Sequence, residues 1–197
     1  MKALICIDVQ NDFVSGALGS PEAREITPKI IAFAKDCRAK GWAIYATADT
    51  HKETDWVPVV TLEASAVPKH CLEGTDGHKI VDGLVKDENG DVIIQQGHIV
   101  DKDTFGCVGL RNALTYDFGD GSGRNGHTGE PLEEIVVCGF VTDICVVSNV
   151  LALRERFPNV RITVMEDLCT GTTSARHDAA IGVMRSCLID IKRSFFK

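Results

Sequence analysis

The amino-acid sequence predicts an α/β fold of three layers, in which a mainly parallel, six-stranded sheet carries helices on both faces. Two observations support this prediction. Short apolar runs alternate with segments of helical spacing along the chain. Two of the runs, residues 3–9 and 134–139, are apolar almost throughout, which is typical of strands buried on both faces. Because crossovers between parallel strands are right-handed, we expect a doubly wound, Rossmann-like sheet.

The first quarter of the chain holds two predicted strands with a helix between them. Residues 3–9 form the first strand, which a single acid, Asp8, interrupts near its carboxyl end. Residues 11–21 are rich in Gly and Ser and predict a loop. Residues 22–40 space their apolar side chains as a helix does and end before a glycine. The second strand follows at residues 42–48.

The middle of the chain has weaker periodicity. Residues 52–76 contain two prolines and predict an excursion over the end of the sheet. Short helices are expected at residues 79–84 and 105–114, with a weak third strand at 92–95 between them. Residues 118–130 contain five glycines and are expected to form a loop or lid.

The last third of the chain alternates regularly. Strands are predicted at residues 134–139, 160–166 and 187–191, with helices at 144–157 and 175–185 between them. This regular alternation completes the expected six strands.

Composition excludes several classes of protein. The 197 residues suit one domain, residues 1–197, with a sizeable core. A net charge of −7 and the absence of any Lys/Arg block argue against a nucleic-acid partner. No apolar run approaches a membrane span, and because a strand is predicted from residue 3 onward, we expect no signal peptide. Eight scattered cysteines without a CxxC pair indicate reduced thiols in a cytoplasmic protein.

Cys145 lies where the strand 134–139 passes into a helix, and Thr142 and Asp143 are good N-cap residues at that join. Ligands of open α/β sheets bind at the carboxyl ends of the strands. The helix dipole and free N–H groups there favour a thiolate, so we predict a nucleophile. The alternative for any one of eight cysteines is a small buried hydrophobic residue.

Two charged residues are candidate partners of Cys145. Asp8 lies inside an apolar run, so it needs a partner, and it is the natural proton acceptor for the thiol. Lys102, on a predicted loop, supplies positive charge that favours both anions. The N–H groups of Cys145 and Val141 are candidates to stabilise an oxyanion. The alternatives are that Asp8 solvates a loop or caps a helix, and that Lys102 is simply solvated.

A metal site is predicted from a second group of residues. Asp49 and His51 are two residues apart on an extended segment, so their side chains point the same way, and His70 follows. Two imidazoles and one carboxylate suit a divalent metal, which we expect to be Zn²⁺, with Fe²⁺ or Mn²⁺ as alternatives. Cys71 is a further candidate ligand, although we favour a packed thiol there.

These segments resemble a known family, the isochorismatase-like cysteine hydrolases. Residues 7–13, Ile-Asp-Val-Gln-Asn-Asp-Phe, resemble its opening motif, and residues 139–145, Gly-Phe-Val-Thr-Asp-Ile-Cys, resemble its nucleophile motif. Lys102 lies between them, where the lysine of the family falls. Asp-Thr-His at residues 49–51, followed by Pro-Lys-His-Cys-Leu-Glu-Gly-Thr at residues 68–75, looks most like the nicotinamidase branch.

The resemblance implies a catalytic triad of Asp8, Lys102 and Cys145. It also implies a cis peptide bond between Phe140 and Val141, which directs the N–H groups of Val141 and Cys145 at the oxyanion. The metal ligands implied by the branch are Asp49, His51 and His70. Aromatic residues are expected to line the substrate pocket: Phe13, Trp56 and Phe105.

The chain departs from the family pattern at Thr50, where a tryptophan is usual, and in the glycine-rich residues 118–130, which look like an insertion. The implied function is metal-dependent hydrolysis of nicotinamide to nicotinic acid and ammonia through a cysteine thioester, a step of NAD salvage. The alternatives are hydrolysis of another small amide or N-carbamoyl compound, and a non-catalytic binding or scaffold protein. Family members often form dimers or tetramers, so a homo-oligomer is expected.

Overall fold

In the computed structural model, which describes residues 1–56, 62–63, 66–120 and 126–194, six parallel strands form one sheet in the order β3-β2-β1-β4-β5-β6. The strands are β1 Lys2–Ile7, β2 Ala43–Asp49, β3 Ile99–Lys102, β4 Glu134–Phe140, β5 Arg161–Thr170 and β6 Asp190–Lys192. The predicted six-stranded parallel sheet is confirmed, and here it is parallel throughout.

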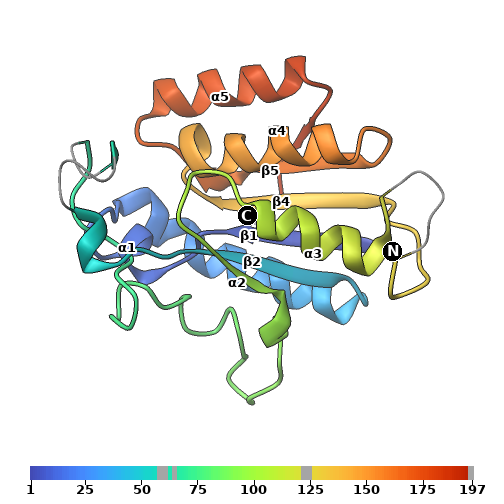
Figure 1. Ribbon diagram of the computed structural model, residues 1–197, viewed down its shortest axis with the longest axis horizontal. Helices are drawn as coiled ribbons and strands as arrows, with labels where there is room; N and C mark the ends of the chain where they lie inside the picture. The colour runs from blue at the N-terminus through green and yellow to red at the C-terminus, as the bar shows by residue number, and fades with distance from the viewer. Residues whose placement is uncertain (57–61, 64–65, 121–125, 195–197) are drawn as a thin grey trace.

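Helices cover both faces of this sheet. They are α1 Asn11–Val14, α2 Pro21–Ala39, α3 Val108–Phe118, α4 Val147–Arg156 and α5 Ser174–Ser186. Shorter turns are the 3₁₀ segments η1 Glu53–Trp56 and η3 Gln96–His98 and the π-helical turn η4 Thr142–Val146. Helices α3 and α4 lie on one face and α2 lies on the opposite face, while α5 packs against α4 and against strands β5 and β6 (Figure 1). The three predicted layers are therefore present.

Two strands at the centre of the sheet bring two distant segments together. Strand β1 pairs with β2 on one side and β4 on the other, and its residues Ala3 to Ile7 are fully buried. Gly139 of β4 has φ of 122° and lies against Ile7, where a Cβ would come within 2.1 Å of the Ile7 carbonyl oxygen. Only glycine fits that close approach. The ends of β1 and β4 are thus held side by side.

The predicted third strand was misplaced. Residues 92–95 contain two buried side chains, Ile93 and Ile94, but they form no strand; β3 begins at Ile99 and ends at Lys102. The apolar run there reflects burial of the two side chains rather than strand pairing. Lys102 is therefore the last residue of a strand and not a loop residue as expected.

Several element boundaries also differ from the prediction. Residues 79–84 form turns rather than a helix, and the helix expected at 105–114 is α3, which starts at Val108. The loop expected at residues 11–21 contains the short helix α1, and the last strand is β6 rather than 187–191. Of the glycine-rich residues 118–130, residues 121–125 lie outside the described part of the chain.

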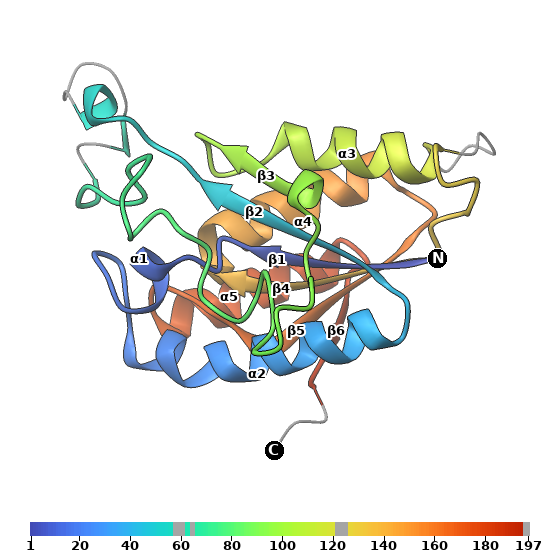
Figure 2. The same ribbon diagram turned by 90° about the horizontal axis from the view of Figure 1, so that it is seen from below.

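The strand ends point toward α1 and the segment that follows β2 (Figure 2). Because all six strands run the same way, their carboxyl ends meet at this one edge of the sheet. Among the described helices, none is long and apolar enough to cross a membrane.

Candidate active site and metal centre

Four neighbouring strands deliver the predicted polar residues to one edge of the sheet. Asp8 follows β1, Asp49 ends β2, Lys102 ends β3, and Cys145 lies in η4 after β4. Asp49 and Lys102 are direct partners in the pairing of β2 with β3. Parallel register therefore places residues that are far apart in the sequence within contact of one another.

Lys102 is the centre of the predicted triad. Its Nζ lies 2.9 Å from Asp8 Oδ2, 2.8 Å from Asp49 Oδ1 and 3.6 Å from Cys145 Sγ. All four residues are buried. A buried ammonium with two carboxylates is well compensated, so the predicted alternative of a solvated loop lysine does not apply.

Asp8 is held in one orientation by its backbone and by Thr47. The residue has φ of 49°, and its N–H donates to the Thr47 carbonyl oxygen at 3.2 Å. The Thr47 hydroxyl donates to Asp8 Oδ1 at 2.6 Å, which leaves Oδ2 facing Lys102. Asp8 thus caps no helix and solvates no loop, contrary to the alternative considered from the sequence.

The buried charged groups shift the pKa values of one another. Burial raises the pKa of the Asp8 carboxyl, and although Lys102 opposes this, the Asp49 charge adds to it. Although burial acts to raise it, hydrogen bonds from His51, His70 and Lys102 hold the pKa of Asp49 below its usual range. Burial acts to lower the pKa of Lys102, but the surrounding anionic groups hold it above its ordinary value. Asp8 is consequently the more basic of the two carboxylates.

The surroundings of Cys145 favour the neutral thiol over the thiolate. Burial raises the pKa of the thiol well above its ordinary value, the Asp8 charge adds to the rise, and Lys102 offsets only part of it. Burial and the Asp8 charge therefore act against the thiolate that the helix start was expected to favour. With the thiol pKa raised, a nucleophilic sulfur at neutral pH needs a neighbouring base to take its proton.

The turn that carries Cys145 has the predicted cis peptide bond between Phe140 and Val141. The turn continues as η4, and the buried Asn149 side chain donates to the Cys145 carbonyl oxygen at 2.8 Å. Thr142 and Asp143 do not cap the helix as expected, because both side chains turn toward the segment after β5. That segment therefore fixes the nucleophile turn from the side.

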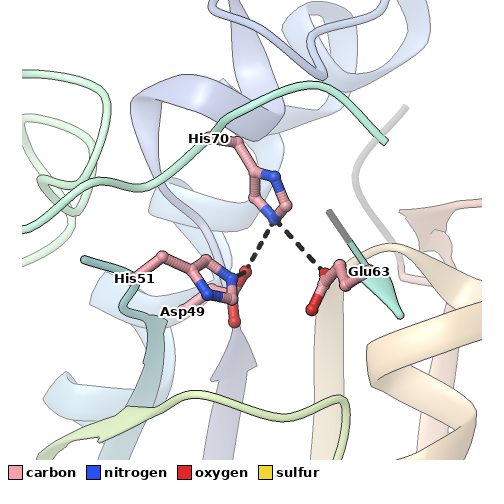
Figure 3. A group of neighbouring side chains, drawn as sticks. All are labelled: Asp49, His51, Glu63 and His70. Carbon is pink, nitrogen blue, oxygen red and sulfur yellow. Dashed lines mark hydrogen bonds and ion pairs between the residues drawn. The ribbon is translucent and has the colours of Figure 1, made fainter. Parts of the chain in front are cut away.

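The residues predicted to bind a metal form a compact cluster (Figure 3). Asp49 Oδ2 lies 3.0 Å from Nε2 of both His51 and His70. Glu63 joins them, with its Oε1 3.6 Å from His70 Nε2. The four ligand atoms lie within 4.8 Å of one another, as the ligands around a single ion do. Cys71 is fully buried and is not part of this cluster, in line with the packed thiol that we favoured.

The charges of the site fit a divalent cation. Asp8 and Asp49 are buried with Lys102 as their shared cation, and Glu63 adds a partly buried carboxylate beside the imidazoles. These residues therefore carry more negative than positive charge, and the atoms that they offer to a metal are carboxylate oxygens and imidazole nitrogens. This donor set suits zinc and, with its carboxylates, iron or manganese.

A cavity of about 500 Å³ opens between the nucleophile and the metal-ligand cluster. Its lining includes Cys145, Asp49, Phe13 and Phe105. Trp56 instead packs edge-on against the imidazoles of the cluster, with its ring centre 5.3 Å from that of His70. A second cavity of about 580 Å³ lies at the amino ends of the strands and contains none of these groups.

Sequence reasoning missed Glu63 and Thr47. Glu63 lies in the excursion after β2, where no periodicity fixes the direction of a side chain, so no sequence signal separates it from the other acids there. Thr47 had a signal: it is a polar residue of a buried strand, two positions before Asp49, and so it needs a hydrogen-bond partner.

Comparison with known proteins agrees with the geometry. The model of the isochorismatase domain matches residues 2–193. The nicotinamidase of Schizosaccharomyces pombe is 26% identical over 218 residues, covering 96% of this chain and 91% of that protein. The nicotinamidase of Escherichia coli is 24% identical over 201 residues, covering 93% and 89%.

A solved structure shows the same fold. The pyrazinamidase of Pyrococcus horikoshii in complex with zinc superposes with a TM-score of 0.75 at 25% identity, covering 98% of this chain and 99% of that one. The curated relatives named above are nicotinamidases, which is the branch that the motifs predicted. The chain therefore belongs to the isochorismatase family, and its relatives indicate amidohydrolase activity.

Proposed function

We propose that the protein hydrolyses nicotinamide to nicotinic acid and ammonia through a thioester on Cys145. The observation that carries the proposal is the position of Asp49, whose Oδ2 contacts both imidazoles while its Oδ1 accepts from Lys102 at 2.8 Å. One carboxylate thus connects a metal-type cluster to a cysteine, an aspartate and a lysine. The nicotinamidase relatives and the zinc complex of a pyrazinamidase support the same assignment.

Asp49, His51 and His70 would hold the metal, with Glu63 as a fourth ligand. When bound, the metal supplies a Lewis acid that holds the pyridine nitrogen or a water molecule. Zinc is the first choice for this donor set. The Phe13 ring packs edge-on against His70, with the ring centres 5.7 Å apart, so a pyridine ring bound beside the cluster can pack against the Phe13 ring.

Asp8 is the base of the reaction. It takes the proton of the Cys145 thiol, and the sulfur forms a bond to the amide carbon. The raised pKa of Asp8 makes it a stronger acceptor than an ordinary carboxylate. The negative charge on the amide oxygen is stabilised by the N–H groups of Val141 and Cys145. Asp8 then returns the proton to the nitrogen as the carbon–nitrogen bond breaks and ammonia leaves.

The second half of the reaction hydrolyses the thioester, and Asp8 again acts as the base. Asp8 takes a proton from water, whose oxygen bonds to the thioester carbon, and the carbon–sulfur bond breaks. The proton returns to the sulfur, which leaves nicotinic acid and the free thiol. Lys102 stays protonated throughout, since the surrounding anions hold its pKa up, and it fixes Asp8 beside the sulfur.

The alternative substrates are another small amide or an N-carbamoyl compound. The cavity of about 500 Å³ has room for such substrates, because pockets of that size accept ligands larger than one pyridine ring. A non-catalytic role is disfavoured, because a binding protein has no need of a lysine buried against both Asp8 and the thiol.

Ammonia release from nicotinamide by the zinc-loaded protein tests the proposal. Cys145→Ala should reduce turnover to background, and Cys187→Ala, at a half-buried thiol, should leave it unchanged. Asp49→Asn should lose bound metal, measured by elemental analysis, and raise KM. Near wild-type turnover by Cys145→Ala would contradict the thioester mechanism. If the zinc-loaded protein hydrolyses other small amides but not nicotinamide, the alternative substrate class is correct.

We further propose a cytoplasmic location and a place in NAD salvage. The eight cysteines are all free thiols, and the Cys6 and Cys138 sulfurs lie 3.8 Å apart without a bond, which suits a reducing compartment. The homo-oligomer stays a prediction, which the mass of the protein in solution tests.

A further inference from the structure

The active-site cavity extends beyond the nucleophile. It is lined by Asp49 at the end of β2 and by Thr170 at the end of β5, and strands β1 and β4 lie between those two. At the usual spacing of neighbouring strands, the two ends are about 14 Å apart. Cys145 follows β4, so it lies between them. A nicotinamide ring beside the metal-ligand cluster therefore leaves the end beside β5 unfilled.

That far end carries positive charge. Arg176, in the first turn of α5, is the one lysine or arginine among the described residues that line the cavity. The same wall includes Thr170, Gly171 and Thr172, and the Arg176 guanidinium contacts the Thr172 hydroxyl. The opposite end holds the carboxylates of Asp49 and Glu63. The cavity is thus polarised along its length.

The guanidinium of Arg176 is available to a ligand. Its Nη1 donates to Thr172 Oγ1 at 3.4 Å, and no carboxylate among the described residues pairs with it. The nearby Asp143 carboxylate is engaged by Thr172, whose N–H donates at 2.7 Å and whose hydroxyl donates at 2.6 Å. An unpaired guanidinium at a cavity wall matches a carboxylate, which it can bind through two parallel N–H donors.

We propose that Arg176 and the Thr170–Thr172 segment form a carboxylate subsite, and that the protein prefers small amides bearing a carboxylate at the end remote from the amide. The proposal rests on amide hydrolysis at Cys145 as proposed above, and it narrows the substrate class. With the amide at Cys145 and the carboxylate at Arg176, the substrate is oriented by both ends. A neutral amide gains only the contacts on the metal side.

Matched pairs of amides test this subsite. Each pair offers the same amide beside either a carboxylate or a second carboxamide: succinamate and succinamide, glutaramate and glutaramide, and 5-carbamoylnicotinate and pyridine-3,5-dicarboxamide. Because Arg176 is solvent-exposed, kcat/KM of the zinc-loaded enzyme should favour the carboxylate of at least one pair by about three- to ten-fold. The preference should decrease as ionic strength rises.

Substitution of Arg176 identifies the group responsible. Arg176→Gln should abolish the preference, chiefly through KM, and Arg176→Lys should retain part of it. Arg185→Gln is the matched control, because Arg185 lies in the last turn of the same helix, is exposed and does not line the cavity. That variant should keep the wild-type preference. Thermal melting of each variant verifies that it is folded.

Three results would overturn the subsite. Equal kcat/KM for the two members of every pair would show that no carboxylate is recognised. A preference that survives in Arg176→Gln would place the carboxylate elsewhere, for instance on the metal. Hydrolysis of nicotinamide without hydrolysis of any member of the pairs would show that the far end is not used. Failure of the proposed function is a separate result, because then neither nicotinamide nor any member of the pairs is hydrolysed.

Discussion

Single residues in this site serve two neighbours at once. Asp49 directs one oxygen at the imidazoles and the other at Lys102, and Lys102 in turn contacts Asp8 and approaches the Cys145 sulfur. The thiol therefore shares its surroundings with two carboxylates and one ammonium. Because the anions outnumber the cation, the resting sulfur keeps its proton, and the chemistry depends on a base rather than on a preformed thiolate.

This balance predicts an unusual effect of Asp8→Asn. The Asp8 charge is one cause of the raised pKa of Cys145, so removing that charge should lower the thiol pKa. The variant should thus hold more thiolate at a given pH while losing nicotinamide turnover, because the proton acceptor is gone. The thiolate absorbance, titrated with pH and corrected by the same titration of Cys145→Ala, measures the shift. An unchanged or higher thiol pKa in Asp8→Asn would show that Asp8 does not control the sulfur.

At the scale of elements, the nucleophile turn η4 depends on α5 and on the segment that leads into it from β5. The fully buried Thr142 hydroxyl lies 2.8 Å from His177 Nδ1 of α5. Gly171 sits between these elements, where a Cβ would come within 2.9 Å of the His177 Cβ. Thr142 is the neighbour of Val141, a proposed oxyanion donor, so we expect this contact to fix the direction of that donor.

We expect His177→Phe and Thr142→Val each to lower kcat by about ten-fold with little change in KM, because a misdirected donor weakens stabilisation of the transition state more than substrate binding. The double variant should lose little more than either single one, since both remove the same contact. His127→Gln is the control, because His127 stacks on Tyr116 far from the site. Additive losses, or a change in KM alone, would contradict a positioning role.

Elements buried on both sides were predictable, whereas those at the edges were not. Residues 3–9 and 134–139 are apolar because helices cover both sheet faces there, and both runs contain strands. Strand β3 is four residues long and ends in Asp101 and Lys102, so it has no comparable run. The buried Ile93 and Ile94 mimicked a strand because hydrophobicity reports burial and not pairing.

The same limit applies to the site. Asp8, Asp49, Lys102 and Cys145 end or follow strands, and parallel register brings such ends together regardless of the sequence between them. His70 lies in the excursion after β2, and its motif rather than strand register made it predictable. Glu63 and Arg176 belong to the segments around the cavity, where only the folded chain decides which side chains meet. The chemistry at Cys145 was therefore readable from the sequence, and the fourth ligand and the far end of the pocket were not.

At the scale of the whole molecule, the buried charges connect stability to metal and pH. In the metal-free protein the hydrogen bond to Asp49 raises the pKa of His51, so a proton on His51 stabilises the fold. That contribution is complete below the unfolded-state pKa of histidine and is lost as pH rises through the raised folded-state pKa. A bound metal requires neutral imidazoles, so protons compete with it at low pH.

Metal removal should therefore destabilise the protein more at high pH than at low pH. At pH 8 the zinc-loaded protein should melt about 5–10 °C above the chelator-treated one, as expected for a ligand present at about one hundred times its Kd. At pH 5.5 the difference should shrink, because protonation of His51 strengthens its contact with Asp49 in the metal-free protein while zinc binding weakens. The control is His51→Gln, whose metal-free form cannot take up this proton and should lose the rise in melting temperature toward acid pH. If the difference in melting temperature between the zinc-loaded and chelator-treated protein is the same at both pH values, protonation of the metal-ligand cluster does not contribute to the stability of the fold.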